Sequence, residues 1–307
     1  MKSALVGYTG FVGGNLASSH DFDLLYNSKN IESAYGQKPD LVVYAGVRAE
    51  KFLANRNPQG DRATILQAFE NLKKISPQKV VLISTIDVYR DPKGKDENSE
   101  MESDGLHPYG KNRLELEELV RKEFDCLIVR LPALFGKGIK KNFIYDALTL
   151  VPSMLTEAKY RELSERSELV RDGYHSSVNG FYTLDVPDEN YQRKLKSFFE
   201  KNDWNSLFFT DSRNKYQFYD LGNLWNVICI ALEHDLEVIN LTSEPVSASE
   251  VYEYCFDKPF VNITASEPIT YDLRSVHAEV FGGESGYCYT RENVLADLKR
   301  FVQGYAV

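Results

Sequence analysis

The sequence lacks the features that mark a membrane protein, an exported protein or a nucleic-acid-binding protein. No apolar run approaches the roughly 20 residues that a membrane-spanning helix needs. The net charge of −9 offers no basic surface to nucleic acid or to an anionic membrane. The chain enters an apolar run directly after Met1 and Lys2, so we expect no signal peptide. We therefore expect a cytoplasmic protein with no nucleic-acid and no membrane partner.

Cysteine and histidine are scarce as well, with four and five residues in a chain of 307. Neither set shows the paired spacing of a metal site. Cys126 and Cys229 lie within apolar runs, as buried thiols of a reducing compartment do. We expect no bound metal and no disulfide framework.

Glycine, in contrast, recurs at three-residue spacing near the start of the chain, which reads MKSALVGYTGFVGGNL. A short apolar run predicts a buried strand, and Gly7, Gly10 and Gly13 follow it just before a predicted helix. A strand, a glycine-rich turn and a helix N-terminus together let backbone N–H groups approach a pyrophosphate. A Cβ at the first or second glycine would obstruct that approach. This stretch predicts a dinucleotide-binding turn.

Strand and helix patterns alternate as far as residue 135, which favours a parallel sheet with right-handed crossovers. The second half is less regular, but a late strand–helix–strand pattern indicates that it interleaves with the first sheet. The sequence thus predicts an α/β fold with a Rossmann-like doubly wound parallel sheet. We expect a dinucleotide-binding domain over 1–136 and a smaller C-terminal substrate-binding lobe over 137–307. The boundary between them is approximate, because the second half interleaves with the first sheet. The expected strands cover 23–26, 41–44, 79–83, 126–131, 205–210 and 237–241, and the expected helices cover 61–74, 109–124, 154–170, 189–202 and 221–232.

Two residues of the first half have the chemistry of an acid/base pair. Tyr109 begins a predicted helix, and Arg113 lies four residues later on the same helical face. A phenol with a pKa near 10 needs such a cation to work as an acid or base at neutral pH. Thr85 ends a predicted strand at its carboxyl end, where open α/β sheets bind ligands. Taken singly, Tyr109 is better explained by packing on the sheet and Thr85 by capping of backbone groups.

Five stretches occur in the order of the extended short-chain dehydrogenase/reductases, which include nucleotide-sugar epimerases, dehydratases and 4-keto-sugar reductases. The chain resembles this family over its first 145 residues, and the later stretches at 216–221 and 240–249 are similar to the family's late junctions. Residues 150–205 have no counterpart. The five stretches are GYTGFVG at 7–13, YAG at 44–46, STIDVY at 84–89, YGKNR at 109–113 and RLPALFG at 130–136.

The resemblance implies a role for each matching residue. Tyr109 would be the general acid/base and Thr85, 24 residues earlier, its hydroxyl partner. The glycines of the turn, with Phe11 and Val12, would hold the cofactor pyrophosphate. The remaining implied contacts are Ala45 and Gly46 with the cofactor ribose, Pro132 with the nicotinamide, and Asn142 with the diphosphate of a nucleotide sugar. Asn142 is equally well interpreted as a helix cap.

Arg113 is the first departure from the family, whose pattern Tyr-x-x-x-Lys places a lysine there. Arginine keeps the charge that would bind the nicotinamide ribose and lower the pKa of Tyr109, but it is bulkier and planar. Lys111, two residues from the tyrosine, points to another side of the helix. A non-catalytic sensor or scaffold that binds a dinucleotide therefore remains an alternative.

The segment 85–87 is the second departure, because it reads Thr-Ile-Asp where the family's dehydratases carry Thr-Asp-Glu. Elimination of water needs both acids for its two proton transfers, so the sequence disfavours a dehydratase. Asp87 is left as a candidate for substrate binding.

The third departure concerns the cofactor. Family members specific for NAD usually end the second strand with an acidic residue, whereas this chain has Ser28 and Lys29 within the segment 27–30. A hydroxyl and a cation suit a 2′-phosphate, so NADP is expected over NAD unless this segment is only a solvated loop. The resemblance implies an epimerase or a 4-keto reductase that acts on a nucleotide sugar, and a homodimer.

Overall fold

The computed structural model describes residues 1–177 and 180–305, and the chain divides into two compact units. Unit 1 comprises Met1–Gly138, Lys215–Val246 and Thr270–Asp297. Unit 2 comprises Ile139–Asn214, Ser247–Ile269 and the C-terminal segment from Leu298. Within the described residues, no helix has the length and apolar character needed to cross a membrane.

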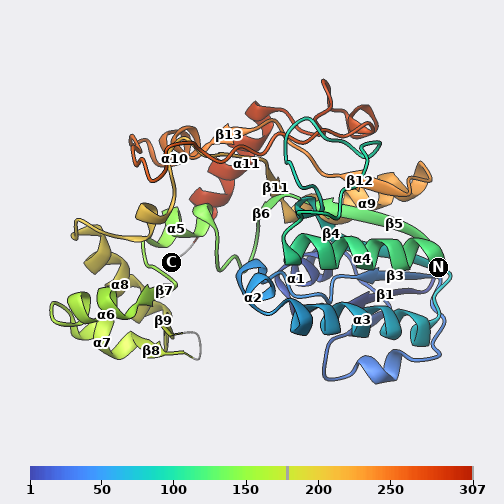
Figure 1. The fold of residues 1–307 in the computed structure, drawn as a ribbon, viewed down its shortest axis with the longest axis horizontal. Coiled ribbons are helices and arrows are strands. Elements are labelled where there is room, and N and C mark those ends of the chain that lie inside the picture. Colours follow the sequence, from blue (N-terminus) through green and yellow to red (C-terminus); the bar gives the residue numbers. More distant parts are fainter. Residues whose placement is uncertain (178–179, 306–307) are drawn as a thin grey trace. The chain divides into compact units, whose positions relative to one another are not determined.

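Unit 1 is built on a six-stranded sheet in which every pairing is parallel. The strand order is β12-β5-β4-β3-β1-β2, so the chain leaves β1 toward one edge and returns on its other side with β3 (Figure 1). This order confirms the expected Rossmann-like doubly wound sheet. The strands are β1 (Ser3–Val6), β2 (Leu24–Tyr26), β3 (Leu41–Tyr44), β4 (Lys79–Thr85), β5 (Asp125–Leu131) and β12 (Val238–Asn240).

Helices cover both faces of this sheet because successive strand residues point to opposite sides. On one face, Leu5 and its neighbours pack against α1 (Phe11–Ser19) and α9 (Leu224–Glu233). On the other face, Ala4 and its neighbours pack against α3 (Pro58–Ile75) and α4 (Pro108–Glu123), as Figure 1 shows. The strands buried on both faces explain the continuous apolar runs of the sequence.

Shorter elements complete unit 1. Two further pairs of short strands form two-stranded sheets of their own, separate from the main sheet. Helix α11 begins in unit 1 and ends in unit 2. These elements are η1 (Ile31–Ala34), α2 (Lys51–Arg56), η2 (Ile86–Val88), β6 (Ala133–Phe135), β10 (Lys215–Tyr216), β11 (Phe218–Asp220), η4 (Leu221–Asn223), β13 (Val246–Ser247), η5 (Ala278–Phe281) and α11 (Arg291–Gly304).

Unit 2 contains a three-stranded antiparallel sheet in the order β7-β9-β8. Its own apolar core includes Leu155, Leu195 and Phe199. The elements are α5 (Phe143–Thr149), β7 (Met154–Thr156), α6 (Glu157–Ser164), α7 (Glu168–Gly173), β8 (Tyr174–Ser176), β9 (Phe181–Leu184), α8 (Glu189–Glu200), η3 (Ser206–Phe209) and α10 (Ala248–Phe256).

Two of the expected elements in unit 2 are wrong. The helix expected over 154–170 begins as β7 instead, because the Thr156 side chain caps α6 by accepting from the Lys159 N–H. The strand expected over 205–210 is the 3-10 helix η3, because the Asn205 side chain accepts from the Leu207 N–H and closes a turn. In both cases a local side-chain hydrogen bond overrides the apolar pattern.

A buried ion pair joins α4 to the sheet of unit 1. Arg130 on β5 is 1% exposed and Glu117 on α4 is 0% exposed. The Arg130 Nη2 lies 2.7 Å from the Glu117 Oε2, and the Ser84 hydroxyl donates to the Glu117 Oε1 at 2.5 Å. Arg130 Nη1 also donates to the Tyr89 hydroxyl at 2.6 Å. Several hydrogen bonds thus satisfy the two charges that folding removes from water.

We predict that Arg130→Met destabilises the protein strongly, because it leaves the Glu117 carboxylate buried without its ionic partner. The expected loss is about 3–5 kcal/mol in the free energy of unfolding. Urea denaturation followed by circular dichroism measures it. Arg62→Met is the matched control, since Arg62 pairs with Glu115 at the surface and should leave the midpoint nearly unchanged. Equal losses in the two variants would contradict the importance of the buried pair.

Asp146 in unit 2 generates a second prediction. Burial raises the pKa of its carboxyl from 3.8 to about 7, and no described side chain pairs with it. The unfolded chain releases this proton near 3.8 and the folded chain near 7, so the contribution of Asp146 to stability is fully present below about pH 4 and is lost as the pH rises through about 7.

Asp146→Asn should therefore flatten the dependence of the urea midpoint on pH between about pH 4 and about pH 7. The exposed Asp172→Asn is the control and should keep the wild-type dependence. A slope that Asp146→Asn leaves unchanged would show that another group sets the pH dependence.

Candidate active site

The glycine turn lies at the carboxyl end of β1, where two of its glycines are required by the backbone itself. Gly7 has a φ of +94°, and a Cβ there would lie 2.6 Å from the Ala45 carbonyl oxygen. A Cβ on Gly13 would lie 2.1 Å from the Gly7 carbonyl oxygen. Gly7 and Gly13 therefore bring β1, the turn and α1 close together.

Gly10 has a different reason to be glycine. A Cβ at this exposed position would meet only the Gly7 carbonyl oxygen, at 3.3 Å. Gly10 is the N-cap of α1, so it supplies no side chain to the first N–H groups of the helix, and the first turn carries no acidic residue. Phe11 and Val12 are the first residues of that helix. The open, uncapped N-terminus fits the charge and size of a pyrophosphate.

The residues expected around the rest of a cofactor lie at the same edge of the sheet. Ala45 and Gly46 directly follow β3, and the Ala45 N–H donates to the Val6 carbonyl at 2.9 Å. Because β1 and β3 flank the point where the strand order reverses, this edge is where doubly wound sheets bind ligands. Pro132, half-buried, separates β5 from β6.

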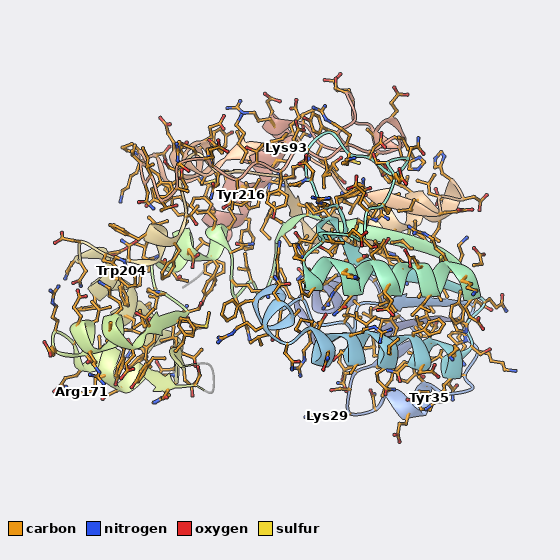
Figure 2. All side chains as sticks on the ribbon, viewed as in Figure 1. Lys29, Tyr35, Lys93, Arg171, Trp204 and Tyr216 are labelled. Atoms are coloured by element: carbon orange, nitrogen blue, oxygen red, sulfur yellow. The ribbon has the colours of Figure 1, made fainter. Side chains whose placement is uncertain are left out.

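Ser28 and Lys29 are exposed in the turn after β2, the strand beside β1 (Figure 2 labels Lys29). The turn is ordered by two asparagines: Asn30 Oδ1 accepts from the Asn27 N–H at 2.7 Å, and Asn27 Oδ1 accepts from the Lys29 N–H at 2.8 Å. The Gly7 N–H donates to the Tyr26 carbonyl at 2.7 Å, which places this turn beside the glycine turn.

Tyr109 and Thr85 are brought together by the packing of α4 on β4. Tyr109 is 6% exposed, and its side chain lies near the Thr85 hydroxyl. The Tyr109 N–H donates to the Asn55 Oδ1 at 2.9 Å. Burial raises the pKa of Tyr109 above 10, while the Arg113 guanidinium and the Thr85 hydroxyl act in the opposite direction.

Arg113 is buried beside this tyrosine and has partners within the protein. Its guanidinium forms an ion pair with Asp61 on α3, and Nη2 donates to the Arg48 carbonyl at 2.6 Å. The Cζ atom lies 4.1 Å from the centroid of the Tyr109 ring, in cation–π geometry. Arg113 therefore joins α3 to α4 and supports the ring of Tyr109.

Lys51 and His107 are site residues that the sequence analysis did not identify. Lys51 Nζ lies 2.7 Å from the Asp87 Oδ1, and His107 Nε2 lies 3.8 Å from the same oxygen. His107 Nδ1 accepts from the Gly110 N–H at 3.0 Å, so the neutral ring carries its proton on Nε2, toward Asp87. Lys51 lies 36 residues from Asp87 along the chain, so no local spacing could reveal the pair.

These neighbours control the ionisation of Asp87. Burial by itself raises the pKa of Asp87, but the polar contact with His107 and the charge of Lys51 outweigh it and hold this pKa below 3.8. Asp87 is therefore a carboxylate in the neutral pH range, with one side occupied by Lys51.

Asn142 belongs to unit 2, whereas the other candidate residues belong to unit 1. Its Oδ1 accepts from the Ile144 N–H at 2.9 Å and the Tyr145 N–H at 3.3 Å, so the side chain caps α5. These two hydrogen bonds are those of a helix N-cap.

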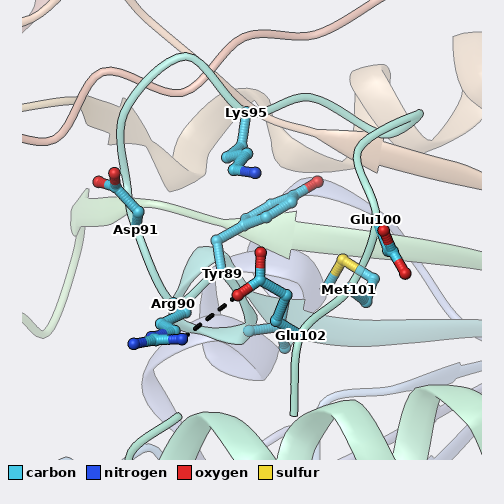
Figure 3. Close-up of a pocket in the computed structure, with 8 residues that line it drawn as sticks. Tyr89, Arg90, Asp91, Lys95, Glu100, Met101 and Glu102 are labelled. Atoms are coloured by element: carbon cyan, nitrogen blue, oxygen red, sulfur yellow. Dashed lines mark hydrogen bonds and ion pairs between the residues drawn. The ribbon is translucent and has the colours of Figure 1, made fainter. Parts of the chain in front are cut away.

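A separate cavity of about 330 Å³ lies in unit 1, beside the loop that follows β4 (Figure 3). Tyr89 and the ion pair of Arg90 with Glu102, at 3.4 Å, form part of its wall. Its lining includes none of the candidate cofactor or acid/base residues. The cavity is thus distinct from the site of Tyr109 and Thr85.

Comparison with known proteins finds this fold in solved structures. No protein-family model and no curated protein matches the sequence, but solved structures match over almost the whole chain. RMD from Pseudomonas aeruginosa, complexed with NADPH, is 17% identical with a TM-score of 0.63, covering 99% of this chain and 98% of its own.

Two further structures represent the two reactions that the sequence resemblance anticipates. The dTDP-4-dehydrorhamnose reductase from Bacillus anthracis, in complex with NADP, is 15% identical with a TM-score of 0.62 and 99% of each chain covered. The UDP-glucose 4-epimerase from Thermotoga maritima, with UDP-glucose, is 13% identical with a TM-score of 0.63, covering 99% of this chain and 98% of its own. At these identities the likeness is one of fold, and it confirms the fold that the resemblance implied.

Proposed function

We propose that the protein is an NADP-dependent enzyme that reduces or epimerises a nucleotide-activated sugar. The observation that carries the proposal is the proximity of Tyr109 to Thr85 at the carboxyl end of β4, on a sheet that carries a glycine turn open to an anion. The neighbours in fold that bind NADPH, NADP or UDP-glucose support the choice of cofactor and substrate class.

A bound nicotinamide would donate a hydride to a sugar carbonyl carbon or accept one from a sugar alcohol. In the reducing direction Tyr109 gives its phenol proton to the carbonyl oxygen, and Thr85 donates a hydrogen bond to the same oxygen. In the oxidising direction the tyrosine, as phenolate, removes the proton of the sugar hydroxyl. Asp87 and Asn142 are the proposed substrate contacts, and unit 2 is the proposed substrate-binding lobe.

The cofactor contacts follow the same edge of unit 1. Backbone N–H groups at Phe11 and Val12 would hold the pyrophosphate, and Ser28 and Lys29 would hold a 2′-phosphate. This basic turn supports NADP over NAD and thereby a 4-keto reductase over an epimerase, because a reductase must exchange its cofactor after every turnover.

Binding of the dinucleotide without turnover is the second candidate function. It is supported by Arg113, which stands where the family has a lysine and forms an ion pair with Asp61. One experiment separates the two. The protein is mixed with NADPH and dTDP-4-dehydrorhamnose, or with NAD and UDP-glucose, and the products are resolved by chromatography. Product in either mixture supports the enzyme, whereas NADPH binding without product in both supports the sensor or scaffold. The proposed homodimer is checked by light scattering.

We predict that Gly10→Val abolishes NADPH binding while leaving the protein folded. The valine Cβ would meet only the Gly7 carbonyl oxygen, and the branched side chain would occupy the space before the N-terminus of α1 where the pyrophosphate is proposed to bind. NADPH fluorescence titration measures binding, and thermal unfolding measures the fold. Gly7→Ala is the contrasting variant and should lower the melting temperature, because its Cβ would lie 2.6 Å from the Ala45 oxygen. Undiminished NADPH affinity in Gly10→Val would remove the turn from the binding site.

We predict that Tyr109→Phe lowers kcat by at least about 100-fold, because general acid/base catalysis supplies roughly that factor or more. NADPH affinity should stay within a few-fold of the wild type, since the phenol meets the reacting oxygen. Tyr35→Phe is the control, because Tyr35 lies away from this site and bonds to Asn71. A wild-type kcat in Tyr109→Phe would exclude the tyrosine from the mechanism.

A further inference from the structure

Lys51 is a charged side chain beside the acid/base pair to which the proposed mechanism gives no role. Its Nζ lies 2.7 Å from the Asp87 Oδ1, and the side chain also lies near the Tyr271 phenol. Burial lowers the pKa of Lys51, but the Asp87 carboxylate outweighs this and raises it above 10.5, so the amine is charged. Asp87 is the less exposed partner, at 19% against 42% for Lys51.

Helix α2 holds this ammonium next to the start of α4. Asn55 lies one turn after Lys51 on the same face of α2, and it accepts the Tyr109 N–H at 2.9 Å. The first turn of α4 also abuts Asp87 directly, because a Cβ on Gly110 would lie 2.0 Å from the Asp87 carbonyl oxygen. Lys51, Asp87 and Tyr109 therefore belong to one local arrangement.

The charges around the phenol cancel in pairs. Arg113 is opposed by Asp61, and Lys51 is opposed by Asp87. His107 contacts the same carboxylate as Lys51, and the phenol of Tyr271 lies beside both Lys51 and Asp87. Without Lys51, Asp87 would place an uncompensated negative charge beside a phenol that must become a phenolate.

The structure assigns Lys51 as a positioning residue that neutralises Asp87 and so permits Tyr109 to lose its proton. Lys51 would neutralise the negative charge of Asp87 from a separate helix, α2. The chain needs this positive charge because Arg113 is already paired with Asp61. The contribution of Lys51 to catalysis rests on the proposed function, whereas its effect on the ionisation of Tyr109 does not.

The test replaces Tyr109 with 3,5-difluorotyrosine in the full-length protein, because ring fluorines bring the phenol titration into a range where proteins stay folded. The fluorine resonance then reports the ionisation of this single residue against pH. Lys51→Met should raise the phenol's apparent pKa by about one unit, and Lys51→Arg should restore it. Lys111→Met, on an exposed part of α4, is the control and should leave the titration unchanged.

A double variant distinguishes neutralisation of Asp87 from a direct effect of Lys51. Asp87→Asn alone should lower the apparent pKa, and Lys51→Met with Asp87→Asn should return it to within a few tenths of a unit of the wild type. The double variant buries no unpaired carboxylate, so it tests the idea even if Lys51→Met folds poorly. A titration that Lys51→Met does not move, or a double variant that keeps the full upward shift, overturns the proposal. Failure of NADPH binding or turnover with these shifts intact would overturn only the proposed function.

Discussion

The ion pair between Arg130 and Glu117 is the constraint on which the acid/base site depends. Two charges buried within an apolar sheet and helix layer are tolerated only when their hydrogen bonds are satisfied, and Ser84 and Tyr89 supply those bonds. The pair holds α4 against β4 and β5, and Tyr109 lies eight residues before Glu117, about two helical turns along the same helix. The position of the phenol beside Thr85 therefore follows from how α4 is anchored to the sheet.

The same network extends to a strand that is distant in sequence. The Asn240 Nδ2 on β12 donates to the Tyr89 hydroxyl at 2.9 Å, and the Tyr89 hydroxyl donates to the Asp96 carbonyl at 2.8 Å. The loop after β4 is thus tied to the edge strand contributed by the second half of the chain. This explains why a segment after residue 215 belongs to unit 1, since its strand completes both the sheet and the buried polar network.

Among the described residues, the buried phenol of Tyr109 has no unpaired cation beside it that would favour its ionisation. Instead, two ion pairs lie near it. Burial opposes ionisation, and the two nearby cations each have a carboxylate partner. The family to which the sequence is similar places a single lysine near its tyrosine. Here the substitution at 113 is accompanied by an acid at 87 and a lysine at 51, so the three positions have to be considered together.

The sequence by itself determined the layered fold and the glycine turn, because both depend on local periodicity or on strand ends that a parallel sheet brings to one edge. The pairing of Tyr109 with Thr85 came from the family resemblance and stays a prediction. The prediction from sequence failed for 154–156 and 205–210, where side-chain caps outweigh apolar pattern. Only the tertiary structure decided the partners of Arg113 and Asp87. Those partners, Asp61 and Lys51, are 52 and 36 residues away and meet only where separate helices pack together, and no spacing along the chain encodes such contacts.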